Sequence, residues 1–518
     1  MLQKIDSFFA RIDSDKTPLA YWLASLLAII LIRNLMEGVL DQSHAVAQPA
    51  VFFINHPLAY MFLFLGLAII LRTATKVRTA GIVKVLTVLF ALILLVPVID
   101  FVQSSGQWGG ISYLFGDANY LANNFVTSYG DSAVTTGQKL EGAIFGSLLL
   151  IYALIRTKSY LKTIAVAVSS YCLLFFIASL PSFVYMFSAA LFGNPLHQQM
   201  LLPGGEFNKE LFSEYVSPDI GALMLSLIVA LEAVVLFAVS DRRSFGFIMR
   251  ALRPIRMFHY WFLGIFGMFL GFSLANTGLS PRDFIFALSF LLSAAFLYSS
   301  ASLMNDLFDN DLHKRLRLAK SEVKPSLIKY SCICALVLSL LIAQGICAEL
   351  AVIMACIASL AFLYSAPPFR LKRYPLIASL TLASCALMAV LAGFSVFARE
   401  ATVGLFPPNV ALAVMVAYTL GTNYKDLKDI KTDKMDRTYT IPVLLGEKRG
   451  KIAVGAMLAI SFLSVPAILG IQTLFLPALL ASLLSAIIIW RGMSEVYLRT
   501  MHLGYILLVI YLASLQAW

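Results

Sequence analysis

Two acidic clusters stand out in a chain that is otherwise strongly apolar. They occupy residues 305–311 and 426–433. A carboxylate at the centre of a membrane helix costs roughly 2.5–3.5 kcal/mol, so carboxylates kept beside apolar segments indicate a function. Within each cluster polar residues recur every three or four positions, a spacing that places them on one face of a helix. The aligned residues are Asn305, Asp306 and Asp309 in the first cluster and Asp426, Asp429 and Asp433 in the second.

Two such faces, if they oppose each other, surround a shared space with carboxylate oxygens. Mg²⁺ prefers oxygen ligands and is often bound through one or two carboxylates together with a substrate phosphate. Because bare carboxylates repel a diphosphate, divalent cations are needed to hold the two together. We therefore expect Mg²⁺ and a diphosphate here, with five metal ligands: Asp306, Asp309, Asp426, Asp429 and Asp433. The competing interpretation, solvated loops of mixed charge, is the better one only for Asp311 and Asp436.

The elements that must position these residues are membrane helices. The chain has 518 residues, of which 60% are hydrophobic and only 13% are charged. This composition predicts an all-α polytopic membrane protein, because lipid offers backbone polar groups no partner outside a helix or a closed barrel. Apolar runs predict about fifteen spans, about six before a basic linker at residues 241–256 and about nine after it. The six cysteines all lie in apolar runs and predict neither a disulfide framework nor a metal site.

The basic residues predict how the chain lies across the membrane. With the N-terminus in the cytoplasm, only five of the 39 Lys and Arg residues fall on or near outer segments: Arg33, Lys139, Lys209, Arg282 and Arg399. Cytoplasmic loops carry the excess of positive charge in membrane proteins, so the N-terminus and both acidic clusters are predicted to be cytoplasmic. The net charge of +11 thus indicates contact with anionic membrane lipid, and we expect no nucleic acid partner.

Four motifs in order resemble those of the UbiA family of intramembrane prenyltransferases. Asn305-Asp306-x-x-Asp309 is similar to the first Asp-rich motif of the family, and Asp426-x-x-Asp429-x-x-x-Asp433 to the second. Between them, residues 364–373 (YSAPPFRLKR) resemble the YSxPPxRLK segment, and residues 440–446 (TIPVLLG) resemble the TLPVxxG tail. The resemblance covers about residues 241–518, whereas residues 1–240 form a six-span module that resembles no family we can name.

The resemblance implies a nine-helix bundle, preceded here by about six additional helices, with a central cavity capped by the motif-bearing loops. It implies Mg²⁺-dependent transfer of a prenyl group from an isoprenoid diphosphate to a lipophilic or aromatic acceptor. Two Mg²⁺ ions, with Arg370, Lys372, Arg373 and Lys425, are expected to neutralise the leaving diphosphate, and Tyr364 to face the allylic cation. The chain departs from the family at His313, where a further aspartate is usual, and this histidine is expected to contact metal or phosphate.

Other activities fit parts of the same pattern. Phosphoribosyl-type transfer to a polyprenyl phosphate and terpene cyclisation both use metal–diphosphate chemistry on this fold. A lipid or small-molecule transporter is the alternative from another class, with the first six spans transporting the substrate. A transporter does not need two aligned acidic clusters, whereas ionisation of a diphosphate does, so prenyl transfer is the preferred prediction.

Overall fold

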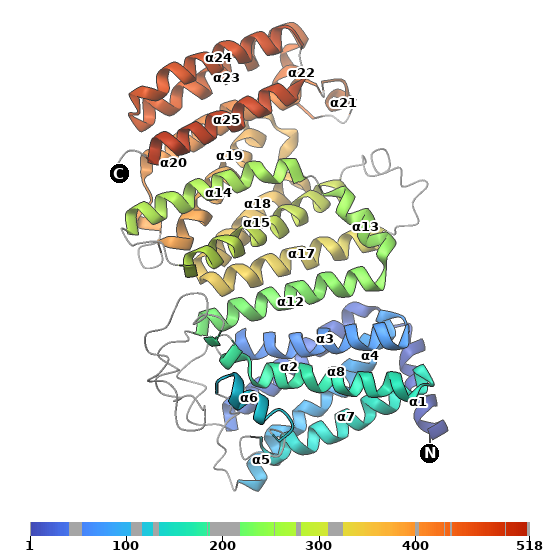
Figure 1. Ribbon diagram of the computed structural model, residues 1–518. Helices are drawn as coiled ribbons and strands as arrows, with labels where there is room; N and C mark the ends of the chain where they lie inside the picture. Colours follow the sequence, from blue (N-terminus) through green and yellow to red (C-terminus); the bar gives the residue numbers. More distant parts are fainter. Residues whose placement is uncertain are drawn as a thin grey trace. The chain divides into compact units, whose positions relative to one another are not determined.

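The computed structural model describes residues 2–40, 54–104, 116–127, 134–183, 185–186, 218–252, 254–275, 281–308, 325–398, 403–428, 430–435, 438–492 and 494–514. The described residues are predominantly α-helical (Figure 1). The chain divides into two compact units, unit 1 at Met1–Phe247 and unit 2 at Ile248–Trp518. The sequence predicts a boundary between two functional domains at residues 240 and 241, and this boundary stays a prediction.

Unit 1 packs its apolar helices around a core of leucine, isoleucine and phenylalanine side chains. The amphipathic first helix is fastened to this core, with the ring of Phe9 lying 5.0 Å from that of Tyr152. An ion pair between Asp13 and Arg156, 2.9 Å long, holds its C-terminal end. The principal helices are α1 (Leu2–Ser14), α2 (Leu19–Leu40), α3 (His56–Thr75), α4 (Thr79–Phe90), α5 (Leu95–Gln103), α6 (Ala118–Asn123), α7 (Thr136–Thr157), α8 (Tyr160–Ala178) and α12 (Pro218–Ser240). Helix α13 (Arg242–Ala251) runs across the boundary of the units.

Unit 2 contains the motif-bearing helices. Several of them begin at a proline, which has no N–H to leave unsatisfied and a backbone angle that suits the first turn. The long helices among the described residues are α14 (Pro254–Ala275), α15 (Pro281–Phe308), α17 (Pro325–Ile346), α18 (Ala348–Ser365), α19 (Pro375–Phe397), α20 (Pro408–Gly421), α23 (Glu447–Leu469), α24 (Phe475–Trp490) and α25 (Glu495–Ser514). Short segments join them: η5 (Leu371–Arg373), η7 (Thr422–Leu427), α21 (Ile430–Met435) and α22 (Ile441–Leu445).

Helices α14 and α19 approach each other at glycines. A Cβ atom placed on Gly267 would lie 1.8 Å from the carbonyl oxygen of Val390, and one on Gly393 would lie 1.9 Å from that of Gly264. Small residues at such positions let helix backbones meet in a membrane, where packing has to replace the hydrophobic effect. The close contact holds α14, which later contributes to the candidate site, tightly against α19.

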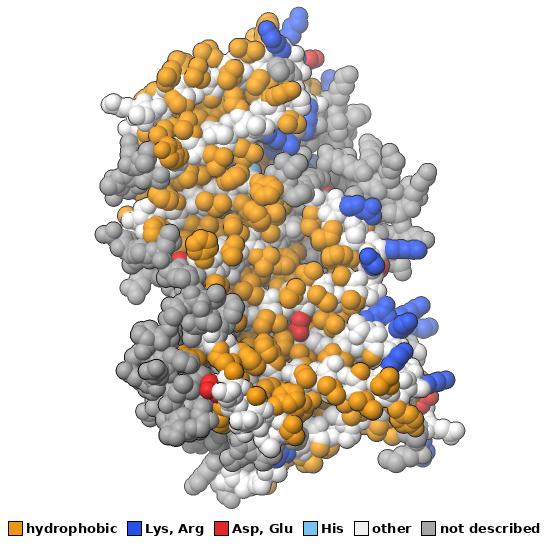
Figure 2. Space-filling view, in the orientation of Figure 1, with side chains coloured by type: hydrophobic (Ala, Val, Ile, Leu, Met, Phe, Trp, Pro, Cys, Tyr) orange, Lys and Arg blue, Asp and Glu red, His pale blue; other side chains and the backbone are white. Residues whose placement is uncertain are grey.

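The surface of the described residues is that of a multi-pass membrane protein. Thirteen of the described helical segments are long and apolar enough to cross a membrane, and a shorter apolar stretch lies at Val496–Leu512. Many leucines are exposed rather than buried, as on α24, where Leu476, Leu480 and Leu483 face outward. In each unit, Figure 2 shows Lys and Arg side chains near one end of the helices and a hydrophobic belt along their flanks. That the basic ends of the helices face the cytoplasm stays a prediction.

Candidate active site

A cavity of about 700 Å³ in unit 2, here called the aspartate cavity, gathers the motif residues. It is bounded by segments that lie far apart in the sequence, from α14 to α25. Nine of the predicted site residues line it: Asn305, Asp306, Tyr364, Arg370, Lys372, Arg373, Lys425, Asp426 and Asp433. The other predicted residues, Asp309, Asp429 and His313, lie outside the described residues, and their roles stay predictions.

The first two polar residues of the first acidic motif lie at the end of a membrane helix. Helix α15 extends to Phe308 and therefore carries both Asn305 and Asp306 into the cavity. The side-chain oxygen of Asn305 accepts hydrogen bonds from the Ser365 hydroxyl at 2.9 Å and from the Lys372 ammonium at 3.3 Å. The asparagine therefore connects the end of α15 to the end of α18 and to the basic segment that follows.

The second acidic motif differs from the expected single helical face. Asp426 lies in the 3₁₀ segment η7, whereas Asp433 lies in α21, a separate α-helix that begins at Ile430. The buried side chain of Asn423 marks the earlier change from α20 to η7, where its amide donates to the backbone carbonyls of Thr419 and Leu420. Such side-chain bonds offer the backbone an alternative to helix continuation. Both aspartates nevertheless line the aspartate cavity.

The YSAPPFRLKR segment begins at the end of α18, which ends at Ser365, and contributes several residues to the lining of the cavity. Arg370 takes a positive φ of 43°, an uncommon conformation for a residue other than glycine and one that accompanies functional sites. The backbone carbonyl of Arg373 then accepts a hydrogen bond from the Tyr439 N–H at 3.0 Å. This bond ties the basic segment to the chain around Asp433, whose carboxylate is 3.5 Å from the Thr440 hydroxyl.

Lys425 places its ammonium group beside Tyr364. The Nζ atom donates to the phenol oxygen at 3.2 Å, and it lies 5.7 Å from the centre of the ring. Burial by itself lowers the pKa of Lys425, but interactions with Tyr364 and Asp426 outweigh it and leave the pKa raised. The cavity therefore holds a permanent positive charge next to the second acidic motif.

Sequence reasoning missed a group of polar residues, here called the polar wall, that also lines the aspartate cavity: His259, Tyr418 and His502. The Nε2 atom of His259 on α14 lies 2.7 Å from the Tyr418 hydroxyl on α20. His502 on α25 lies beside both, its ring 6.2 Å from that of His259. Polar residues within membrane spans are a general sign of function, and this signal could have identified the wall.

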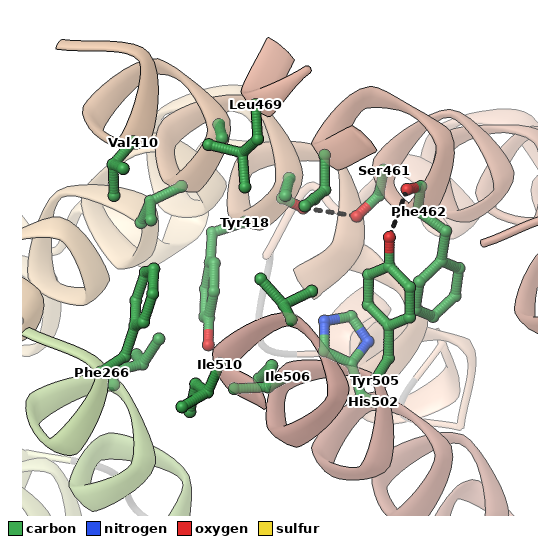
Figure 3. A pocket seen from close by; sticks show the side chains of 16 residues that line it. Phe266, Val410, Tyr418, Ser461, Phe462, Leu469, His502, Tyr505, Ile506 and Ile510 are labelled. Atoms are coloured by element: carbon green, nitrogen blue, oxygen red, sulfur yellow. Dashed lines mark hydrogen bonds between the residues drawn. The ribbon is translucent and has the colours of Figure 1, made fainter. Parts of the chain in front are cut away.

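A smaller apolar pocket of about 70 Å³ adjoins this wall (Figure 3). Tyr418 and His502 line both this pocket and the aspartate cavity. The remaining lining is mostly aliphatic or aromatic, with Leu263, Phe266 and Val410 among its members. Tyr418 and His502 thus lie between the polar aspartate cavity and the apolar pocket.

The donor set of the aspartate cavity suits a hard cation. Among the described residues there is no group of three His, Cys, Asp or Glu side chains close enough together to hold a metal ion. The oxygens of Asp306, Asp426, Asp433 and Asn305 nevertheless line one cavity, and carboxylate and carbonyl oxygens are the ligands that Mg²⁺ prefers. These residues fit Mg²⁺ better than a softer, thiolate-seeking metal.

The sequence of this part of the chain matches the model of the UbiA prenyltransferase family over residues 264–511. This region is a UbiA-family domain. All four motifs that line or adjoin the cavity fall inside the matched range. The match does not extend to unit 1, and a search of curated proteins found no significant match to the chain.

Solved structures similar to this chain include several UbiA homologues. One from Archaeoglobus fulgidus, bound to GPP and Mg²⁺, is 22% identical with a TM-score of 0.40, over 51% of this chain and 97% of that one. An apo homologue from Aeropyrum pernix K1 is 18% identical with a TM-score of 0.37, over 51% and 98%. A digeranylgeranylglyceryl phosphate synthase is 16% identical with a TM-score of 0.37, over 52% and 96%.

Proposed function

We propose that this protein is an Mg²⁺-dependent intramembrane prenyltransferase. It transfers an isoprenoid group from its diphosphate to a lipophilic or aromatic acceptor within the membrane. One observation carries the proposal: side chains from four separate motifs of a UbiA-family domain line a single cavity, with carboxylates and cations together. A transporter interpretation does not explain why carboxylates and basic residues from such distant segments converge.

The diphosphate binds where cations and carboxylates meet. Arg370, Lys372 and Arg373 belong to one short segment, and all three line the same cavity as the acidic motifs. Asp306, Asp426 and Asp433, with Asp309 and Asp429 from the two motifs, would hold two Mg²⁺ ions, which when bound neutralise the diphosphate and allow the carboxylates to approach it.

Transfer begins when the bond between C1 of the prenyl group and the diphosphate oxygen breaks. Negative charge then develops on the leaving diphosphate, and positive charge spreads over the allylic carbons. Lys372 and Lys425 line the cavity and would oppose the negative charge, and such fixed charges are the largest contribution available to this kind of reaction. Tyr364 also lines the cavity, and its aromatic ring would stabilise the allylic cation.

Water must be kept away from the allylic cation, or the products are only an alcohol and diphosphate. Beyond the charged groups the aspartate cavity is lined by apolar side chains such as Phe290, Leu297 and Met354. These residues lie on helices that cross the membrane, so the prenyl chain and a lipophilic acceptor can enter a space with little water.

The proposal is tested by incubating membranes that contain the full-length protein with tritium-labelled allylic diphosphates and Mg²⁺. We expect label in a lipid extract and stoichiometric release of diphosphate, and mass spectrometry of the labelled product identifies the acceptor. Release of a free prenyl alcohol alone, or no reaction with any chain length from geranyl to decaprenyl, contradicts the proposal.

A further inference from the structure

The polar wall of the aspartate cavity contains a hydrogen-bonded pair of a histidine and a tyrosine. His259 and Tyr418 come from different helices, α14 and α20, yet their Nε2 and hydroxyl atoms lie 2.7 Å apart. When Nδ1 of the imidazole carries the proton, Nε2 accepts the hydrogen bond that the phenol donates. The oxygen of Tyr418 then remains free to accept a second hydrogen bond from a molecule in the cavity.

The pair is held in place by a shell of aromatic and titratable side chains. The ring of His502 lies 5.2 Å from that of Phe462 and 6.2 Å from that of Tyr424, the residue two before Asp426. Arg499 lines the same cavity and acts electrostatically on His259. The titratable groups that contact or act on His259 are Tyr260 on its own helix, Tyr418 on α20, and Arg499 and His502 on α25. Tyr298 on α15 packs against Tyr260, and Tyr424 in η7 packs against His502.

We propose that His259, acting through Tyr418, takes up the proton that the acceptor loses when it is prenylated. This inference rests on the proposed prenyl transfer and deepens it. The bond from C1 to the diphosphate oxygen breaks, and its electron pair leaves with the diphosphate. A new bond forms between C1 and the acceptor, whose proton passes to the Tyr418 oxygen while the Tyr418 proton passes to Nε2 of His259. The imidazolium later releases this proton to water as the products leave.

The relay specifies the class of acceptor. A phenol, an alcohol or an activated aromatic C–H must give up a proton on alkylation and so needs a base, whereas an ionised polyprenyl phosphate does not. The relay also lies on the wall that adjoins the apolar pocket, so the acceptor presents its proton-bearing group beside Tyr418. We infer a proton-bearing, lipophilic acceptor.

The test compares His259→Gln and Tyr418→Phe with the wild-type protein in the membranes of its own cells, which supply the acceptor. Glutamine can still bond to Tyr418 but cannot take up a proton. With tritium-labelled geranyl and geranylgeranyl diphosphates, we expect transfer at saturating donor to fall by about 100-fold or more in both variants. Mg²⁺-dependent binding of the labelled diphosphates to the purified variants should change by less than about threefold.

The pH profile separates a proton relay from a structural role. Wild-type transfer should fall when acid protonates His259, because the imidazolium cannot take up a proton, and the residual activity of His259→Gln should lack this fall. Tyr152→Phe is the matched control, because it also removes a buried hydroxyl, bonded to the Asp13 carboxylate at 3.3 Å, but lies in unit 1 and lines neither the aspartate cavity nor the apolar pocket. It should keep wild-type transfer.

Two results overturn the relay alone: an unchanged rate and pH profile in His259→Gln while the wild type transfers label, or an equal loss in Tyr152→Phe. Absence of transfer by the wild type from every donor overturns the proposed function itself, and the relay with it.

Discussion

Among the single residues, Lys425 places a positive charge next to the second acidic motif, where we propose that the substrate diphosphate binds. Its Nζ atom contacts the Tyr364 hydroxyl, and it immediately precedes Asp426. Because its pKa is raised, the group stays protonated below and through the ordinary lysine range, and loses its charge only at more alkaline pH. A loss of activity between pH 7 and 9 therefore does not come from Lys425.

We predict that Lys425→Met raises the KM for the isoprenoid diphosphate by about tenfold and lowers kcat, because a cation facing the leaving group is lost. Lys425→Arg should retain most of the activity, and Tyr364→Phe separates the lysine's charge from its hydrogen bond. Steady-state kinetics of all three variants provides the measurement. Wild-type constants in Lys425→Met would remove this residue from the site.

The site residues that could be predicted from sequence are those in local motifs, such as Asp306 and Asp426, whose spacing and neighbours are visible along the chain. His259 and Tyr418 could not be paired in this way, because they are 159 positions apart and meet only through the packing of α14 and α20. The hydrogen bond from Ser379 on α19 to Asn423 likewise joins residues that are 44 positions apart.

At the scale of elements, the glycine crossing of α14 and α19 is the contact with the least room for change. We predict that Gly267→Ala destabilises the protein by about 3 kcal/mol or more, since the new Cβ meets a backbone oxygen that cannot rotate away. Thermal unfolding in detergent measures the loss. Gly455→Ala on α23 is the control, because its Cβ meets nothing within 4 Å and should not destabilise the fold.

Helix α2 of unit 1 carries a buried ion pair between Arg33 and Glu37, whose side chains are 1% and 3% exposed. Glu37→Ala should cost about 3–5 kcal/mol, because it leaves a buried guanidinium without its partner. The double variant Arg33→Leu, Glu37→Leu should recover most of this loss. The partly exposed pair of Glu447 and Lys451 is the comparison, and Glu447→Ala should cost about 0.5 kcal/mol or less. Equal losses at the two pairs would contradict the argument from burial.

At the scale of the whole molecule, the residues that line the aspartate cavity all come from unit 2, between His259 and Leu503. We predict that a fragment of residues 241–518 binds labelled geranylgeranyl diphosphate in the presence of Mg²⁺ with a Kd within about threefold of the full chain. Equilibrium binding in detergent is the measurement, with thermal unfolding to establish that the fragment is folded. A folded fragment that does not bind would mean that unit 1 contributes to the site.

The helical membrane class followed directly from composition, because a chain with so few charged residues has few other ways to satisfy its backbone in lipid. The spans of the second half were likewise predictable, since prolines such as Pro375 and Pro408 mark where α19 and α20 begin. What apolar periodicity cannot give is which helices pack together, because lipid-facing and buried leucines are the same residue type. The motifs therefore suggested that their residues meet in one cavity, but only the structure gives the helices and side chains that form it.

The central claim is that the acidic motifs hold the isoprenoid diphosphate through Mg²⁺, and one binding measurement tests it most directly. Purified full-length protein is titrated with tritium-labelled geranylgeranyl diphosphate at increasing Mg²⁺, alongside Asp306→Asn and Asp426→Asn. We predict binding that requires Mg²⁺, disappears with EDTA, and weakens by about 100-fold or more in both variants while their unfolding temperatures stay near that of the wild type. Binding that persists without metal, or that neither substitution weakens, would contradict the account.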